Sequence, residues 1–274
     1  MRTVVIAHAL LAAALALPLA WGQQADSTGH LAASAQAPGE RTLRIITSFT
    51  SPPFSFKKGL KEEGFDIDLG EAVGKELGAK VEWVRMTFDV PAYAKALDEG
   101  RADAAMAGIT ITDGRRKLVA FTRPYFRTGL AVAVKDTMEW DHESFARKLK
   151  GWSVGVMRGT TGEKWARANL DAKIETYPSL DSLITAIRNS KIPRGAVKEG
   201  FCAIHDQAVL MWAHLRYGSG FRVAEYGITR EDYGIAVRKD NAKLLEDFNA
   251  ALEKLDREKV CDKIREKWYG RMLD

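Results

Sequence analysis

Two loops and one strand end of this chain carry groups suited to holding a small charged molecule. Arg115 ends the stretch AGITITDGR, in which Gly108 lets another group approach the backbone and Thr110 offers a hydroxyl. RGTTG (158–162) is a glycine-threonine turn directly before a predicted helix, whose free N–H groups favour an anion. Asp206 ends the segment AIHD and offers a carboxylate to a cation.

Together these groups match an α-amino acid zwitterion. Arg115 would hold a carboxylate through two parallel hydrogen bonds, which a lysine cannot imitate, and Asp206 would take an ammonium. Each group also has a structural interpretation, and the residues alone leave both open. Arg115 could be a solvated charge at a helix start, the glycine-threonine turn a helix cap, Asp206 a helix N-cap, and His205 a packed core histidine.

The elements that must position these groups alternate between strands and helices. RTLRIIT (41–47) is typical of a buried strand, and GFDIDLGEAVGKELG (64–78) carries an apolar helical stripe that ends at a glycine. The same order of strand and helix restarts at WSVGVMRG (152–159). This alternation predicts two α/β units, each a parallel sheet covered by helices. Open sheets of this kind bind ligands at the carboxyl ends of their strands, where the candidate groups lie.

Two apolar segments limit the second unit. GLAVAVK (129–135) precedes it and YGIAVRK (233–239) follows it, so both are predicted to cross between the units. The second unit is then an insertion in the first, and the amphipathic helices after residue 240 return to the first unit. We predict one lobe over 41–131 plus 236–274 and the other over 132–235. The alternative is a C-terminal tail that packs on whichever unit is nearest.

The N-terminus and the composition bear on location and partners. Residues 1–22 predict a signal peptide, with Arg2, an apolar run and a small-x-small cleavage site, although a membrane anchor is the alternative. Residues 23–40 are small and polar and predict a flexible leader. The net charge of +5 is spread among acidic residues without a basic run, so no nucleic-acid partner is expected. In an oxidising compartment Cys202 and Cys261 could form a disulfide or remain separate buried thiols.

Several blocks of the sequence resemble the periplasmic solute-binding proteins of polar amino-acid ABC importers, family 3, most closely the glutamine-binding type. GFDIDLGEAVGKELG is similar to the signature segment of that family, and AGITITDGRRKLVAFTRPYFRTGLAVAVK resembles its ligand-arginine segment followed by a hinge strand. VGVMRGTTG, AIHD, YGIAVRK and IREKWYG match later blocks in order. The resemblance covers about residues 41–272. It implies an α/β, two-lobed periplasmic-binding-protein fold of type II, with two hinge strands.

The resemblance also assigns residues to the site. It places Arg115 on the ligand carboxylate and Asp206 on the ammonium. Thr161, at a helix start, would give further hydrogen bonds to the carboxylate, and Phe88 would form the apolar wall. Gly108 would contribute a main-chain carbonyl and Thr110 a hydroxyl.

Some positions depart from the family pattern. Ser48 stands where glutamine and basic amino-acid binders commonly have an aspartate, and Ser51 stands where an aromatic ring often stacks on the ligand. Met157 replaces a position that can be polar, and His205 is expected near the side-chain pocket. The missing aspartate argues weakly against lysine or arginine as ligand. Residues 190–200 form an unusually long link before AIHD and are predicted to be a surface insertion.

The resulting functional hypothesis is a monomeric periplasmic protein that binds a polar amino acid by lobe closure and delivers it to an inner-membrane ABC transporter permease. It expects no cofactor, no metal and no catalytic residue. Two alternatives remain open. One is a cyclohexadienyl or arogenate dehydratase-like enzyme of the same fold, with Glu163 or His205 as the proton-transfer group. The other is a sensory ligand-binding module.

Overall fold

The computed structural model describes residues 41–140, 142–146, 149–191 and 200–270. The predicted signal peptide, the predicted leader and most of the predicted insertion at 190–200 lie outside the described residues. Among the described helices, none has the length and hydropathy that crossing a bilayer requires.

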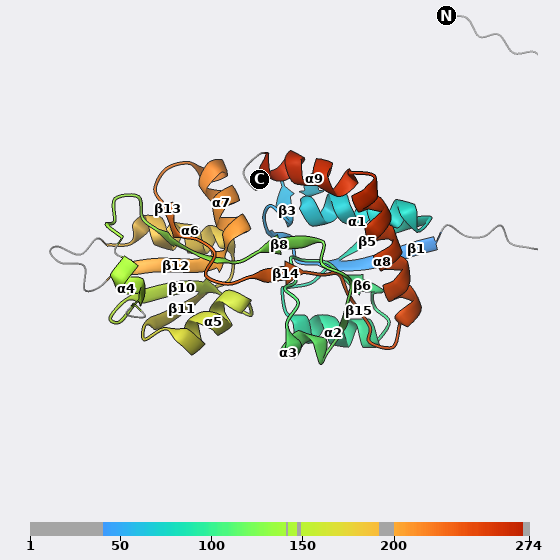
Figure 1. Cartoon of the computed structure of the whole chain (residues 1–274), viewed down its shortest axis with the longest axis horizontal. Coiled ribbons are helices and arrows are strands. Elements are labelled where there is room, and N and C mark those ends of the chain that lie inside the picture. The colour runs from blue at the N-terminus through green and yellow to red at the C-terminus, as the bar shows by residue number, and fades with distance from the viewer. Residues whose placement is uncertain (1–40, 141, 147–148, 192–199, 271–274) are drawn as a thin grey trace, which may run out of the picture. The chain divides into compact units, whose positions relative to one another are not determined.

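The first lobe is built on a five-stranded sheet with strand order β5-β1-β6-β15-β7 (Figure 1). Its strands are β1 (Arg41–Thr47), β5 (Ala79–Arg85), β6 (Ala104–Ala105), β7 (Ala120–Phe121) and β15 (Ala236–Val237). β1 is parallel to β5 and β6, whereas β15 is antiparallel to both of its neighbours. The sheet is therefore mixed, not fully parallel as the sequence predicts, because β15 enters it from the other lobe.

The alternation of side chains along β1 fixes which helix covers which face of this sheet. Leu43 and Ile45 pack in one core cluster, and Ile46 packs in another. The first cluster includes buried residues of α1 (Phe65–Glu76), α8 (Ala242–Arg257) and α9 (Val260–Tyr269). The second includes buried residues of α2 (Val90–Asp98). The C-terminal helices thus pack on the first lobe, against α1 (Figure 1).

The second lobe repeats this plan with strand order β11-β10-β12-β9-β13. Its strands are β9 (Leu130–Val134), β10 (Ser153–Met157), β11 (Lys173–Tyr177), β12 (Phe201–Asp206) and β13 (Arg222–Glu225). Its helices are α4 (His142–Ala146), α5 (Thr161–Asn169), α6 (Leu180–Asn189) and α7 (Gln207–Tyr217). α5 packs on one face of the sheet and α6 and α7 on the other. β9 is the one strand of this sheet that runs against its neighbours.

The connection between the lobes differs from the predicted one. β9 and β15, which lie in the predicted crossing segments 129–135 and 233–239, each belong to one sheet. Between the two sheets β8 (Phe126–Thr128) and β14 (Glu231–Tyr233) form a separate antiparallel pair (Figure 1). Leu130 and Ala131, which the predicted boundary gives to the first lobe, pair with β12 of the second. The remaining lobe boundaries stay a prediction.

Shorter elements complete the first lobe. β2 (Thr50–Ser51), β3 (Ser55–Lys58) and β4 (Lys61–Glu63) form a small antiparallel sheet, and α3 (Asp113–Arg116) is a single turn of helix. Cys202 and Cys261 are both free and buried, so they are separate thiols and not a disulfide. Burial raises the pKa of the Cys261 thiol to about 12, which keeps the thiol protonated at neutral pH.

Candidate functional site

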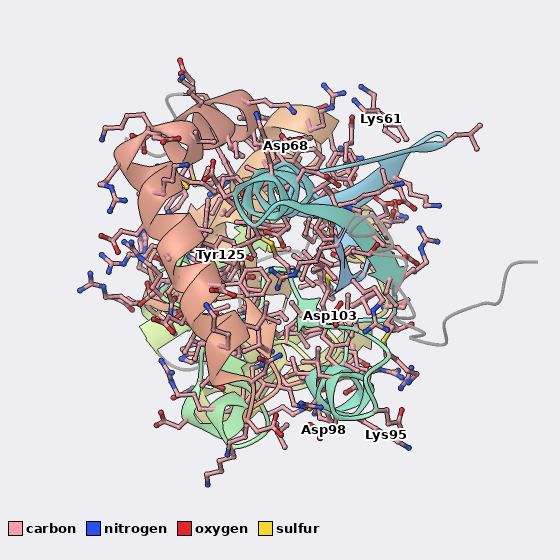
Figure 2. All side chains as sticks on the ribbon, turned by 90° about the vertical axis from the view of Figure 1, so that its right-hand side faces the viewer. Lys61, Asp68, Lys95, Asp98, Asp103 and Tyr125 are labelled. Carbon is pink, nitrogen blue, oxygen red and sulfur yellow. The ribbon has the colours of Figure 1, made fainter. Side chains whose placement is uncertain are left out.

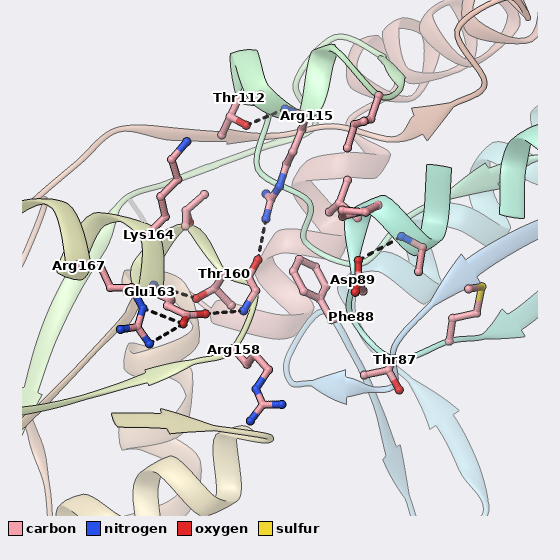
Figure 3. A pocket seen from close by; sticks show the side chains of 18 residues that line it. Thr87, Phe88, Asp89, Thr112, Arg115, Arg158, Thr160, Glu163, Lys164 and Arg167 are labelled. Carbon is pink, nitrogen blue, oxygen red and sulfur yellow. Dashed lines mark hydrogen bonds and ion pairs between the residues drawn. The ribbon is translucent and has the colours of Figure 1, made fainter. Parts of the chain in front are cut away.

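A pocket of about 960 Å³ lies where α2, α3 and the start of α5 meet (Figure 3). Phe88 and Arg115 line it from the first lobe, and Thr160, Thr161 and Glu163 line it from the second. A much smaller cavity of about 30 Å³ shares Phe88 and Thr160 with it. Of the remaining predicted residues, those that line this cavity are Ser51, Gly108, Met157, His205 and Asp206.

Arg115 reaches across the interface between the lobes (Figure 3). The hydroxyl of Thr112 caps α3 by accepting a hydrogen bond from the Arg115 amide at 3.2 Å. The guanidinium donates through Nη1 to the Thr110 carbonyl at 2.9 Å and through Nη2 to the Gly159 carbonyl at 3.4 Å. A guanidinium has five N–H donors, so these bonds use only part of its capacity.

The environment of the Arg115 guanidinium is partly apolar and partly anionic. Its carbon lies 5.6 Å from the centroid of the Phe88 ring, within cation–π range. Burial lowers the pKa of Arg115, and the charges of Asp206 and Glu231 oppose that shift. Arginine remains protonated in such surroundings, so the group is a partly desolvated cation.

Asp206 is a buried carboxylate at the end of β12. Tyr233 donates a short hydrogen bond to Oδ2, whereas the buried Oδ1 has no hydrogen-bond partner among the described residues. Burial raises the pKa of Asp206 to about 6, while the Tyr233 bond and the Arg115 charge act in the opposite direction. Asp206 occupies the N-cap position of α7, as the structural interpretation expects, but its side chain makes no capping bond. An unpartnered buried carboxylate oxygen is suited to an incoming N–H donor.

His205 is a packed core histidine, which is one of the two interpretations that the sequence left open, and it lines the small cavity. Its Nδ1 accepts from the Asp206 amide at 2.6 Å, and its Nε2 lies 2.9 Å from the Met157 sulfur. Burial lowers the pKa of His205 to about 4, so the imidazole is neutral at neutral pH. Both ring nitrogens are therefore engaged within the protein.

The hydroxyls of Thr110 and Thr161 turn toward Glu231, a residue that the sequence reasoning missed. Both donate to Glu231 Oε2, each at 2.8 Å. Glu231 is buried in β14, between Arg230 and Asp232. No feature of the sequence distinguishes it from a solvated charge in the run TRED.

Ser48 and Gly108 are two further predicted site residues whose side chain or backbone contacts other parts of the protein. Ser48 is buried and lines neither cavity, and its hydroxyl accepts a bond of 3.4 Å from the Thr50 amide. Gly108 has a φ of 58° and approaches the Tyr233 ring so closely that an added Cβ would lie 3.2 Å from it. Its amide donates to Asp66 at 2.7 Å. The predicted role of its carbonyl stays a prediction.

Asp66 anchors the loop that carries Gly108. It is fully buried at the start of α1, and its carboxylate accepts from the Gly108 amide and from the Tyr125 hydroxyl, the latter at 2.9 Å. Burial raises the pKa of Asp66 to about 7, while both hydrogen bonds lower it.

Replacing Asp66 by alanine is expected to reduce the free energy of unfolding by about 2–4 kcal/mol, because two buried donors lose their acceptor. Urea unfolding of the ligand-free protein measures this change. Asp98→Ala is the control and should change stability by less than about 0.5 kcal/mol, since Asp98 is exposed at the end of α2, whereas Tyr125 lies in the interior (Figure 2). Equal losses in the two variants would show that Asp66 does not anchor this loop.

A match to a known protein family shows to which family the chain belongs. The model of the bacterial extracellular solute-binding proteins, family 3, matches residues 43–271. The chain belongs to this family. The family 3 protein has the two-lobed α/β fold that the sequence predicts, of the type II periplasmic-binding class.

Relatives of this family 3 protein span nearly the whole chain. A probable histidine-binding protein of Neisseria gonorrhoeae is 31% identical over 273 residues, which cover 97% of this chain and 95% of the relative. ABC transporter arginine-binding protein 1 of Escherichia coli K12 is 31% identical over 236 residues, which cover 83% and 90%.

Solved structures give the same picture. An ancestral arginine-binding protein bound to glutamine matches with a TM-score of 0.72 and 36% identity, over 84% of this chain and 98% of the other. The ancestral amino acid-binding protein AncCDT-1, a precursor of cyclohexadienyl dehydratase, matches with a TM-score of 0.74 and 33% identity, over 83% and 95%.

Proposed function

We propose that the protein binds a polar amino acid as a zwitterion and delivers it to an ABC importer. The observation that carries this proposal is that the Arg115 guanidinium and the Asp206 carboxylate lie near each other. A desolvated guanidinium from the first lobe and a buried carboxylate with one unpartnered oxygen from the second lie close enough that each charge influences the pKa of the other. A ligand carboxylate would take the guanidinium, and its ammonium would take Asp206 Oδ1.

Lobe closure is the mechanism that this arrangement supports. Arg115 already joins the lobes through its contact with the Gly159 carbonyl, while its contact with Thr110 stays within the first lobe. A ligand held by Arg115 on one side and Asp206 on the other makes its full set of contacts only when the lobes are together, so it favours the closed state. Rotation would be absorbed at the β8–β14 pair.

The relatives support a polar amino acid, and further relatives that are named arginine-binding or lysine/arginine/ornithine-binding periplasmic proteins support location in the periplasm. Those named above are called histidine-binding and arginine-binding, and the ancestral protein was solved with glutamine. Of the positions predicted to contact the ligand side chain, Ser51 is small and Met157 is apolar, whereas Ser48 is buried and lines neither cavity. These three positions carry no charge that would select a ligand side chain, so the names of the relatives make basic and neutral amino acids the candidates to test first.

The dehydratase alternative has weaker support at the two residues it needs. Glu163 accepts from the Gly159 amide and pairs with Arg167, so its carboxylate is held by the α5 turn. His205 is neutral and occupied at both nitrogens. Proton-transfer catalysis needs a group within reach of substrate and free to change its protonation. Turnover of prephenate or arogenate by the purified protein would nevertheless favour the enzyme.

A thermal-unfolding screen of the twenty amino acids tests the proposal on protein stripped of bound ligand by unfolding and refolding. A ligand at about 100 times its Kd stabilises the native state by about 2.7 kcal/mol. For a protein of this size we expect a rise in Tm of roughly 5–10 °C. Histidine, arginine and glutamine are expected among the strongest. If no amino acid shifts Tm by more than about 1 °C, amino-acid binding is ruled out.

A further inference from the structure

Glu231 is a buried carboxylate held by three hydroxyls at the junction of the lobes. Thr110 from the first lobe and Thr161 at the start of α5 in the second both donate to Oε2 at 2.8 Å. Thr229 donates to Oε1 at 3.3 Å. The structure therefore shows a carboxylate of the chain itself joining the two lobes, close to the Arg115 guanidinium.

An ionised Glu231 determines where the neighbouring threonine hydroxyls donate their protons. A carboxylate only accepts hydrogen bonds, so the protons of Thr110 and Thr161 must both point at Oε2. Neither hydroxyl can then donate to the carboxylate of a ligand. A protonated Glu231 carries its own O–H and can donate to one threonine, which frees that hydroxyl to donate elsewhere.

The charges around Glu231 favour the same change. The titratable and charged side chains that influence it are Asp206 and His205 of β12, Arg115 of α3 and Tyr233 of β14. His205 is neutral, and Arg127 on the partner strand β8 is exposed and pairs with Asp232. One cation thus faces two carboxylates, and a zwitterion adds no net charge to this buried site.

In the ligand-free protein the pKa of Glu231 is already raised, which favours the protonated side chain. Burial raises the pKa of Glu231 above 4.5, the negative charge of Asp206 raises it further, and the three threonine hydroxyls lower it. A ligand carboxylate beside Arg115 would raise the pKa again, whereas the ligand ammonium beside Asp206 would act in the opposite direction, so the competition for the hydroxyls carries the argument.

We propose that Glu231 competes with the ligand carboxylate for the hydroxyls of Thr110 and Thr161, and that the protein takes up a proton at Glu231 when it binds its amino acid. This inference rests on the proposed function. It makes Glu231 a residue of the binding site that sets affinity, and it makes the affinity depend on pH. Binding should weaken as the pH rises above the pKa of Glu231 in the free protein, by up to about tenfold per pH unit.

Titration calorimetry of the stripped protein tests the proposal, with the amino acid that stabilises it most in the thermal screen. Measurements at several pH values above 4.5, each in two buffers of different ionisation enthalpy, are expected to show net proton uptake on binding over part of this range. The Glu231→Gln variant, which mimics the protonated side chain, should take up no proton, and its affinity should exceed that of wild type by up to about tenfold for each pH unit above the pKa of Glu231 in the free protein. Because the ligand's own ammonium titrates equally in both proteins, the difference between them isolates Glu231.

The matched control is Asp232→Asn, which removes the neighbouring carboxylate on the exposed side of β14 and should leave affinity and proton uptake unchanged. Wild-type binding without proton uptake would overturn the proposal, and so would a Glu231→Gln protein that binds more weakly at every pH. The wild-type measurement stands even if the variant fails to fold. If the wild type binds no amino acid at all, the proposed function itself fails.

Discussion

Replacing Arg115 by alanine is expected to weaken amino-acid binding by at least about 100-fold, because the ligand carboxylate would lose its charge-assisted donors while Asp206 and Glu231 would face it without a cation. Calorimetric titration with the best ligand from the thermal screen measures the loss. Arg115→Lys keeps the charge but not the two parallel donors, so it should lose about tenfold or more.

Arg116→Ala is the matched control for Arg115. Arg116 follows on the same single turn of helix, but it is exposed and lines neither cavity, so its removal should leave affinity unchanged. An Arg115→Ala protein with the wild-type Kd would contradict the zwitterion model. So would equal losses in the two alanine variants, which would point to a general effect of charge at the mouth of the pocket.

The distinction between these two arginines shows how much of the site the sequence predicts. The apolar run before Arg115 and the charged turn around it indicate a strand end followed by a turn. The resemblance then selects Arg115 over its neighbours. The structure places Arg115 in the pocket and leaves Arg116 and Lys117 exposed. The stripe of α1 and the alternating faces of β1 were likewise predictable, because both are long enough to show their period.

Glu231 and the β8–β14 pair could not be predicted, because the strands are short and the environment of Glu231 comes from distant parts of the sequence. Each of these strands has three residues, which is too short for a period-2 pattern to appear. The environment of Glu231 is assembled by Thr110, Thr161 and Asp206, which are distant in sequence and meet only through the order of strands in two sheets. Ser48 shows the reverse case, since this residue was predicted to be part of the pocket but is buried and lines neither cavity.

Asp206→Asn is expected to weaken amino-acid binding by about 100-fold, because the ligand ammonium loses the carboxylate that would neutralise it. The amide keeps an oxygen that can accept the Tyr233 bond, so the packing of the site is retained. A sharper measurement compares the amino acid with its deaminated carboxylic acid. Wild type should prefer the amino acid strongly, and the variant should lose most of that preference.

The Asp206 pKa of about 6 predicts the direction in which affinity changes with pH. Below about pH 6 Asp206 is protonated and cannot neutralise an ammonium, so wild-type affinity should fall by up to about tenfold per pH unit as the pH decreases. Asp206→Asn should lack this fall, and Asp113→Asn, which changes an exposed carboxylate on α3, should retain it. The dependence expected from Glu231 has the opposite direction, so wild-type affinity should pass through a maximum.

Stability separates loss of the ligand contact from loss of the fold. Because burial raises the pKa of Asp206 above its ordinary value of 3.8, the folded protein holds a proton there that the unfolded chain releases. The Asp206 contribution to ligand-free stability therefore decreases as the pH rises from about 4 through about 6. The amide of the Asp206→Asn variant stays neutral at every pH. Above pH ~6 this variant should therefore unfold at a urea concentration at least as high as that needed for wild type, although it binds the amino acid far more weakly. A variant that loses both stability and binding would instead assign Asp206 a structural role.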